Sequence, residues 1–208
     1  TTETGTDGNR WGMNQSISFA GSGEMDNGWT VSYGQTLANG SSTGINFALD
    51  MGDAGTLDYQ SDTAARGIGK IDDVMPTANE EIWDGLDSNG STPTGGVSGK
   101  VSGGGTGFDY TNSSIENVTI GIGYAPKGGG TSAQGGVSGA GGGHSNTSIY
   151  LTVKPMDGLD IGAGVGEGAS AAGLSTTTDY TTYYAKYTYG PITVGFQQSE
   201  TDVPGATD

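Results

Sequence analysis

Carboxylates crowd one stretch of this chain, and carboxylates are the groups in it best suited to binding or attracting ions. Between residues 66 and 87 the acidic residues outnumber the basic ones by six to two. The acidic residues are Asp72, Asp73, Glu80, Glu81, Asp84 and Asp87, and the basic residues are Arg66 and Lys70. Hard cations prefer oxygen ligands, so Asp72, Asp73, Glu80 and Glu81 are a candidate Ca²⁺ site. The plainer interpretation is an acidic external loop that is solvated by water or neutralised by surface divalent cations.

Other site chemistry is poorly supported by the residues present. The 208 residues include no cysteine and one histidine, His144, which follows a run of glycines, and nothing in the sequence around it indicates a carboxylate that would position it. We therefore expect no enzyme and, apart from Ca²⁺, no cofactor. With 23 acidic and 7 basic residues the formal charge is −16, which disfavours nucleic acid as a partner because phosphate binding needs a basic surface.

The elements that must position these carboxylates are predicted to be β-strands. Hydrophobic residues make up only 32% of the chain, and no apolar run approaches the about 20 residues of a transmembrane helix. Instead, apolar and polar residues alternate, as in Val31, Tyr33 and Leu37 or in Ile45, Phe47 and Leu49. Such alternation indicates strands with one apolar and one polar face. Ten segments show it, near residues 11–25, 29–37, 45–51, 57–60, 108–110, 118–124, 149–153, 159–165, 183–189 and 192–196.

The links between these segments predict an antiparallel order with two unlike rims. Tight turns are expected at 26–28, 53–55, 155–158 and 190–191, with a medium link at 111–117. Asn27-Gly28 favours a type I′ hairpin. The alternate links, at 38–43, 62–104, 126–144 and 167–178, are longer or more polar. Short turns on one rim and long loops on the other are typical of a transmembrane β-barrel of the bacterial outer membrane.

The two faces of the strands suit two different surroundings. The polar face consists mostly of Thr, Ser, Gly and Asn, which suits a water-filled lumen, whereas the opposite face suits lipid. The charged residues of the polar face, and so the candidate pore wall, are Asp50, Asp58, Lys154 and Lys186. The aromatic residues expected at the membrane interfaces are Trp11, Trp29, Tyr59, Tyr124, Tyr183, Tyr189 and Phe196.

Two stretches resemble the Gram-negative general porins, in the form found in alphaproteobacteria and especially their marine members. They are Ile17–Trp29, which reads ISFAGSGEMDNGW, and Ile71–Gly85, which reads IDDVMPTANEEIWDG. The resemblance implies a sixteen-stranded barrel, a homotrimer in outer-membrane lipid, and passive diffusion of small hydrophilic solutes. It also implies that the third external loop narrows the lumen. We expect residues 1–208 to form one porin domain that lacks strands at both ends, with 62–104 as the constriction loop.

The same resemblance gives the acidic cluster a role. Held inside a narrow lumen, Asp72, Asp73, Glu80, Glu81 and Asp84 would attract cations, because low-dielectric walls focus the field. Porins usually oppose this loop with arginines on the wall, but the only arginines here are Arg10 and Arg66, outside the clear strands. A cation-preferring channel is therefore expected. The alternative is a secreted, Gly- and Thr-rich acidic surface or adhesive β-protein.

Overall fold

Ten β-strands and two short 3₁₀ helices make up the regular structure in the computed structural model, which describes residues 15–38, 41–60, 66–71, 74–76, 107–126, 145–169 and 177–202. The strands are β1 (Ser16–Glu24), β2 (Thr30–Ala38), β3 (Ser41–Asp50), β4 (Thr56–Gln60), β5 (Gly107–Asn112), β6 (Val118–Ala125), β7 (Asn146–Met156), β8 (Leu159–Ala169), β9 (Thr177–Tyr189) and β10 (Ile192–Asp202). The helices are η1 (Gly52–Ala54) and η2 (Gly67–Ile71). The described part contains no helix long and apolar enough to span a membrane.

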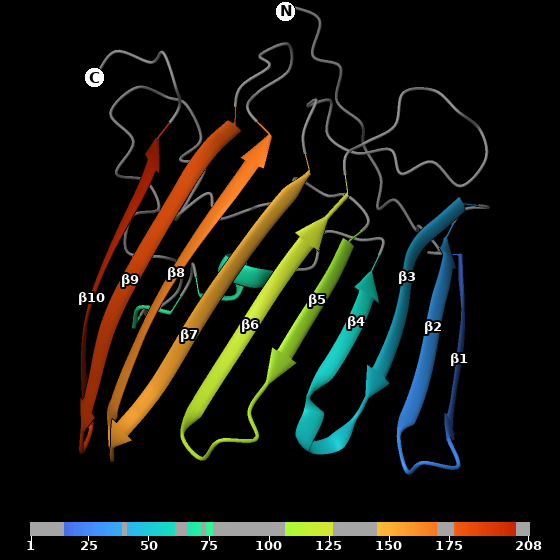
Figure 1. The fold of residues 1–208 in the computed structure, drawn as a ribbon, viewed down its shortest axis with the longest axis horizontal. Helices are drawn as coiled ribbons and strands as arrows, with labels where there is room; N and C mark the ends of the chain where they lie inside the picture. The colour runs from blue at the N-terminus through green and yellow to red at the C-terminus, as the bar shows by residue number, and fades with distance from the viewer. Residues whose placement is uncertain are drawn as a thin grey trace, which may run out of the picture.

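The strands form one antiparallel sheet in simple sequence order, from β1 to β10 (Figure 1). The prediction of ten antiparallel strands is thus confirmed. The sheet curves, so that β1 and β10 turn away from the viewer in Figure 1 and η2 lies behind the strands, on the concave side. Among the described residues β1 and β10 each have one neighbour and do not pair with each other.

The two rims differ largely as predicted, with one exception. Five short links, of which the shortest are 157–158 and 190–191, join the strands at one rim. At the other rim the strand ends are those that the long links 61–106, 126–145 and 170–176 connect. The exception is the expected longer link at 38–43, because β2 ends at Ala38 and β3 begins at Ser41. Residues that the sequence suggested as a polar loop, Ser41 to Gly44, instead continue the ladder of β3 against β2.

The Asp26-Asn27-Gly28 turn differs from the type I′ prediction. Among these residues only Gly28 has a positive φ, of 81°. The Met25 carbonyl accepts from the Gly28 N–H at 2.8 Å, and the Met25 N–H donates to the Trp29 carbonyl at 2.7 Å. Three-residue hairpin loops usually consist of a type I turn followed by a residue, often glycine, in the left-handed conformation. In such a loop Asn27 needs no left-handed conformation.

The convex face is apolar and open, as expected of a surface in contact with hydrocarbon. Its side chains include Val194 and Phe196, each 59% exposed, and Ile17, which is 58% exposed. Leu49 and Ile120 lie on the same face and are half-buried by their neighbours along the sheet. None of these side chains belongs to the buried cluster of the described residues, which is on the concave side. Among the described residues, therefore, no second protein layer packs against the convex face.

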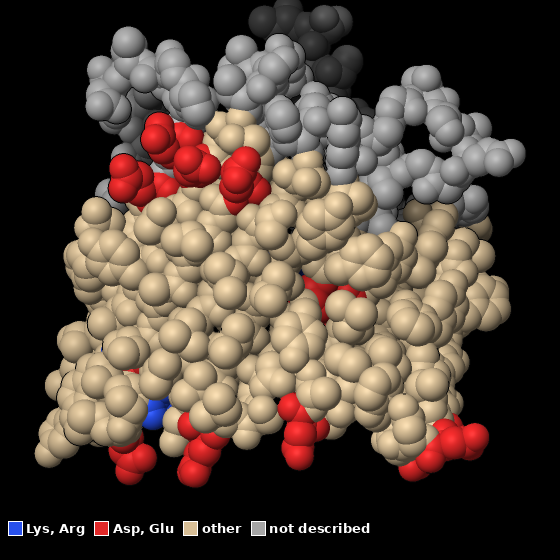
Figure 2. Space-filling model, viewed as in Figure 1, with Lys and Arg blue, Asp and Glu red and all other residues tan. Residues whose placement is uncertain are grey.

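Charged groups lie at the edges of this face. Figure 2 shows a broad belt nearly free of charge, with carboxylates along the short-turn rim and in one group at the opposite rim. The exposed carboxylates of the short turns are Asp26, Asp53, Glu116 and Asp157, and the other group, at the ends of β8 to β10, is Glu167, Asp179, Glu200 and Asp202. An uncharged belt between two polar rims is the surface of a transmembrane β-sheet.

The aromatic residues divide into two sets. Trp29, Tyr59, Tyr124 and Tyr189 lie next to or near strand ends, as the interface hypothesis requires, whereas Trp11 lies outside the described residues. Tyr183 and Phe196 are inside β9 and β10, where their rings contact each other with centroids 6.3 Å apart. Their expected place at the interface was therefore wrong, because cross-strand ring packing can hold an aromatic pair at mid-strand.

Two tyrosines on the concave face depend on glycines across the sheet. Tyr150 is the register partner of Gly121, and Tyr184 is the partner of Gly162. Each tyrosine is 5% exposed, and its ring occupies the space that a side chain on the opposite glycine would need. Glycine is therefore required at both positions for the rings to lie flat against the wall.

This packing predicts the effect of an added methyl group. Gly121→Ala should lower the free energy of unfolding by about 1–3 kcal/mol, because the new Cβ overlaps the Tyr150 ring. Gly34→Ala is the matched control, since nothing lies within 4 Å of its Cβ position. Urea unfolding in lipid vesicles, followed by tryptophan fluorescence, measures both. Equal stability of the two variants would show that Gly121 is not needed to make room for the Tyr150 ring.

Candidate functional site

A segment of the longest connection lies on the concave face of the sheet. Residues 66–71 and 74–76 belong to the link between β4 and β5, and they contact β6, β7 and β8 through η2. Ile68 is fully buried, Ile71 is 2% exposed and Met75 is 6% exposed. Together with Tyr150 and Tyr184 they form the buried apolar cluster of the described residues. We call residues 66–71 and 74–76 the inner segment.

Glycines on the strands make room for the inner segment. A Cβ on Gly123 would lie 2.8 Å from the backbone nitrogen of Gly67, and one on Gly164 would lie 2.9 Å from Cγ1 of Ile68. On β10, a Cβ at Gly195 would lie 2.7 Å from Sδ of Met75. All three distances are too short for a real side chain. The sequence suggested that the face of small polar residues lines a water-filled lumen. Over β6 to β10 the same face also packs against the inner segment.

Hydrogen bonds from three strands hold the backbone of the inner segment. The Ile68 N–H donates to Oγ of Ser148 on β7 at 3.1 Å. The Gln197 side-chain amide on β10 donates to the Ile71 carbonyl at 3.1 Å, and Nζ of Lys186 on β9 donates to the Val74 carbonyl at 3.0 Å. A buried irregular segment needs such partners because its backbone groups have no ladder of their own.

One ion pair joins the inner segment to β5. Asp109 is 1% exposed, and its Oδ1 accepts from the Gly67 N–H at 2.8 Å. Its other oxygen, Oδ2, accepts from the Lys70 ammonium and from Thr111 Oγ1, the latter at 3.2 Å. Lys70 also donates to Thr111 Oγ1 at 3.2 Å. A buried carboxylate is tolerated because both of its oxygens have donors and its charge has a partner.

The predicted constriction residues Asp72, Asp73, Glu80, Glu81 and Asp84, with the Ca²⁺ site built from the first four, lie outside the described residues. Asp72 and Asp73 are enclosed in sequence by Ile71 and Val74, which both belong to the inner segment. Within the residues that the structure does describe, no three His, Asp or Glu side chains are grouped so as to hold a metal.

The four predicted wall residues have different surroundings. Asp58 lies on the concave face of β4, directly opposite Asp109 in the register. Asp50 is exposed at the end of β3, where its Oδ1 accepts from the Gly52 N–H at 2.9 Å and so caps a turn. Lys186 binds the inner segment through Val74, as described above. Lys154 and Lys186 both line a cavity of about 370 Å³ near the 157–158 turn, which Asp160 also lines.

Sequence reasoning missed the side chains that hold the inner segment, chiefly Asp109, Ser148 and Gln197. Each lies at a polar position of its strand's alternating pattern, where the sequence alone suggested an ordinary residue lining the lumen. The available signal was the alternation of glycines in β6 and β8, at Gly121 and Gly123 and at Gly162 and Gly164, which exceeds what a solvated wall needs. It indicates close approach of other groups, though not which ones.

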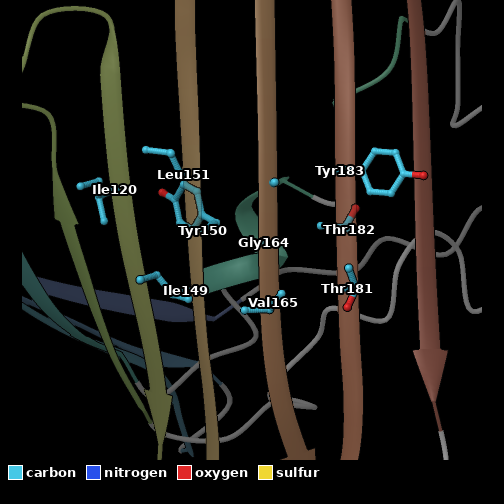
Figure 3. Close-up of a pocket in the computed structure, with 10 residues that line it drawn as sticks. Ile120, Ile149, Tyr150, Leu151, Gly164, Val165, Thr181, Thr182 and Tyr183 are labelled. Carbon is cyan, nitrogen blue, oxygen red and sulfur yellow. The ribbon is translucent and has the colours of Figure 1, made fainter.

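The convex side carries a hollow of a different kind. A cavity of about 390 Å³ lies over β6 to β9 and is lined by apolar groups that include Ile120, Leu151 and Val165. Figure 3 shows Tyr183 at one side of it and η2 behind the strands, on the opposite face of the sheet. Because this hollow belongs to the apolar belt, it is a feature of the hydrocarbon-facing surface and not of a solute path.

Comparison with known proteins identifies the family. The model of the family described as Gram-negative porin matches residues 1–208. Two engineered variants of the porin from Rh. blastica are similar in structure, each at 15% identity over 93% of this chain and 76% of theirs, with TM-scores of 0.43 and 0.44. No curated protein matches the chain.

The family match covers the whole chain, and it agrees with the single antiparallel sheet and its apolar outer belt. The reading as a secreted adhesive protein has no such support. The chain belongs to the Gram-negative porins, a family of passive, non-enzymatic channels of the bacterial outer membrane.

Proposed function

We propose that this porin lets small hydrophilic solutes and ions diffuse across the outer membrane and that it prefers cations. The observation that carries the proposal is the inner segment, which places part of the longest connection on the concave side of the sheet. The same connection also contains the five carboxylates between Asp72 and Asp84. We therefore propose that link 62–104 is the constriction loop and that its carboxylates face the ion path.

The charge distribution supports a preference for cations. The described strands bring Lys154 and Lys186 to the concave side, and Lys186 is already engaged by the inner segment. Two lysines do not balance the five carboxylates between Asp72 and Asp84. Fixed negative charge in a narrow aqueous passage raises the local concentration of cations and lowers that of anions.

The first test is the current through single channels. Purified full-length protein in a planar bilayer should form ohmic pores, and the reversal potential in a KCl gradient should have the sign of cation preference. Neutralising Asp72, Asp73, Glu80 and Glu81 together, as Asn or Gln, should shift the reversal potential toward anions because four fixed charges leave the passage.

A matched control separates this effect from a change in total charge. Neutralising Asp26, Asp53, Glu116 and Asp157 removes the same four charges from the exposed short-turn rim. The shift should be much smaller than for the loop variant, since charges at a wide rim are screened within about 8–10 Å. Shifts of equal size would place the loop carboxylates away from the ion path.

Homotrimer formation follows from the resemblance and is part of the proposal. Purified protein in mild detergent should have the mass of three chains by light scattering after subtraction of the bound detergent. Unheated samples should migrate as one larger species on an SDS gel and convert to monomer on boiling. A monomeric mass before heating would contradict the trimer.

A further inference from the structure

Two carboxylates face each other across neighbouring strands on the concave side. Asp58 of β4 and Asp109 of β5 are register partners and both lie on the polar parity. Like charges directly opposite on one face of a sheet repel each other and destabilise the pair. Such a pair therefore calls for a cation between or beside its members.

The inner segment supplies that cation. Lys70, at the end of η2, binds Asp109 through its ammonium group, and its side chain remains 32% exposed. Asp58 is also within electrostatic range of both Lys70 and Asp109. One ammonium thus serves two carboxylates, and the trio keeps a net charge of −1.

The three groups differ in access to water. Asp109 is 1% exposed and cannot meet a passing ion, whereas Asp58 is half-buried and Lys70 is one-third exposed. Asp58 and Lys70 are therefore the members whose charge reaches the lumen. Asp109 instead fixes the position of the segment, because its other oxygen holds the Gly67 N–H.

We propose that Lys70 is a selectivity-determining residue, whose charge offsets the Asp58–Asp109 pair, and that Asp109 is the positioning residue that holds it there. The inserted loop thus acts on permeation in two opposite ways. Its distal carboxylates attract cations, while Lys70 at its base reduces the cation attraction of the wall. The inference rests on the proposed function in one respect, that the concave side is the ion path.

The decisive variants change one charge each. Lys70→Met should raise the ratio of cation to anion permeability about twofold in 0.1 M KCl and less in 1 M KCl, where screening shortens to about 3 Å. Asp58→Asn should lower the ratio. The double variant should return close to the wild-type ratio, because the two charges cancel. Lys70→Arg keeps the charge and should shift the ratio less than Lys70→Met does.

Lys154→Met is the matched control for loss of a lysine. It removes the same charge at the 157–158 end of the wall, away from Asp58, and should change the ratio less than Lys70→Met. If Lys70→Met and Asp58→Asn both leave the permeability ratio unchanged in channels of normal conductance, the inference is overturned. Absence of an ohmic pore in the wild type would instead overturn the proposed function itself.

Position and charge can be separated at Asp109. Asp109→Asn keeps an oxygen for the Gly67 N–H but leaves Lys70 without its anionic partner, so the ratio should shift toward anions at nearly constant conductance. Asp109→Ala removes the acceptor as well and should add open-channel noise or change the conductance as the segment loosens. Identical behaviour of both variants would contradict the positioning role.

Circular dichroism and heat-modifiable gel mobility establish that each variant is folded. If Lys70→Met does not fold, Asp58→Asn, at a half-buried site, still tests the charge assignment.

Discussion

The alternation of side chains across a single sheet is the constraint on which the rest of this structure depends. Among the described residues no second protein layer covers the convex side, so the outward-facing residues of each strand must tolerate hydrocarbon, and every charge must lie on the concave face or at a rim. The low hydrophobic content of the chain follows directly, because only one residue in two along each strand is required to be apolar.

The concave face has two tasks, and its composition reflects both. Over β6 to β10 its glycines and small polar side chains receive the inner segment, so that Ile68 and Met75 are buried against the wall. The acidic and basic partners of the charged contact are on the opposite sides from those expected. Near β4 and β5 the wall supplies the carboxylates, Asp58 and Asp109, and the loop supplies the lysine. At this contact the arrangement expected from the resemblance, an acidic loop against a basic wall, is therefore reversed.

Much of the fold could be predicted from the sequence because strand periodicity is a local signal. The ten strands, the apolar convex face and the tight turn at 190–191 all follow from residues close in sequence. The details that failed depend on tertiary context, such as the pairing of Ser41 to Gly44 with β2 and the mid-strand contact of Tyr183 with Phe196. The Lys70–Asp109 pair joins residues 39 positions apart across a long link, and no local pattern indicates such a partner.

The most direct test of the two-sided wall compares adjacent residues of one strand. Because the chain has no cysteine, Ala48→Cys and Leu49→Cys each introduce a single thiol, on the concave and the convex face of β3 respectively. In lipid vesicles a membrane-impermeant, water-soluble thiol reagent should label residue 48 and spare residue 49. A fluorophore attached at residue 49 alone should be quenched by brominated lipid chains. Equal labelling at both positions, with no difference in lipid quenching, would show that the strand does not separate water from hydrocarbon.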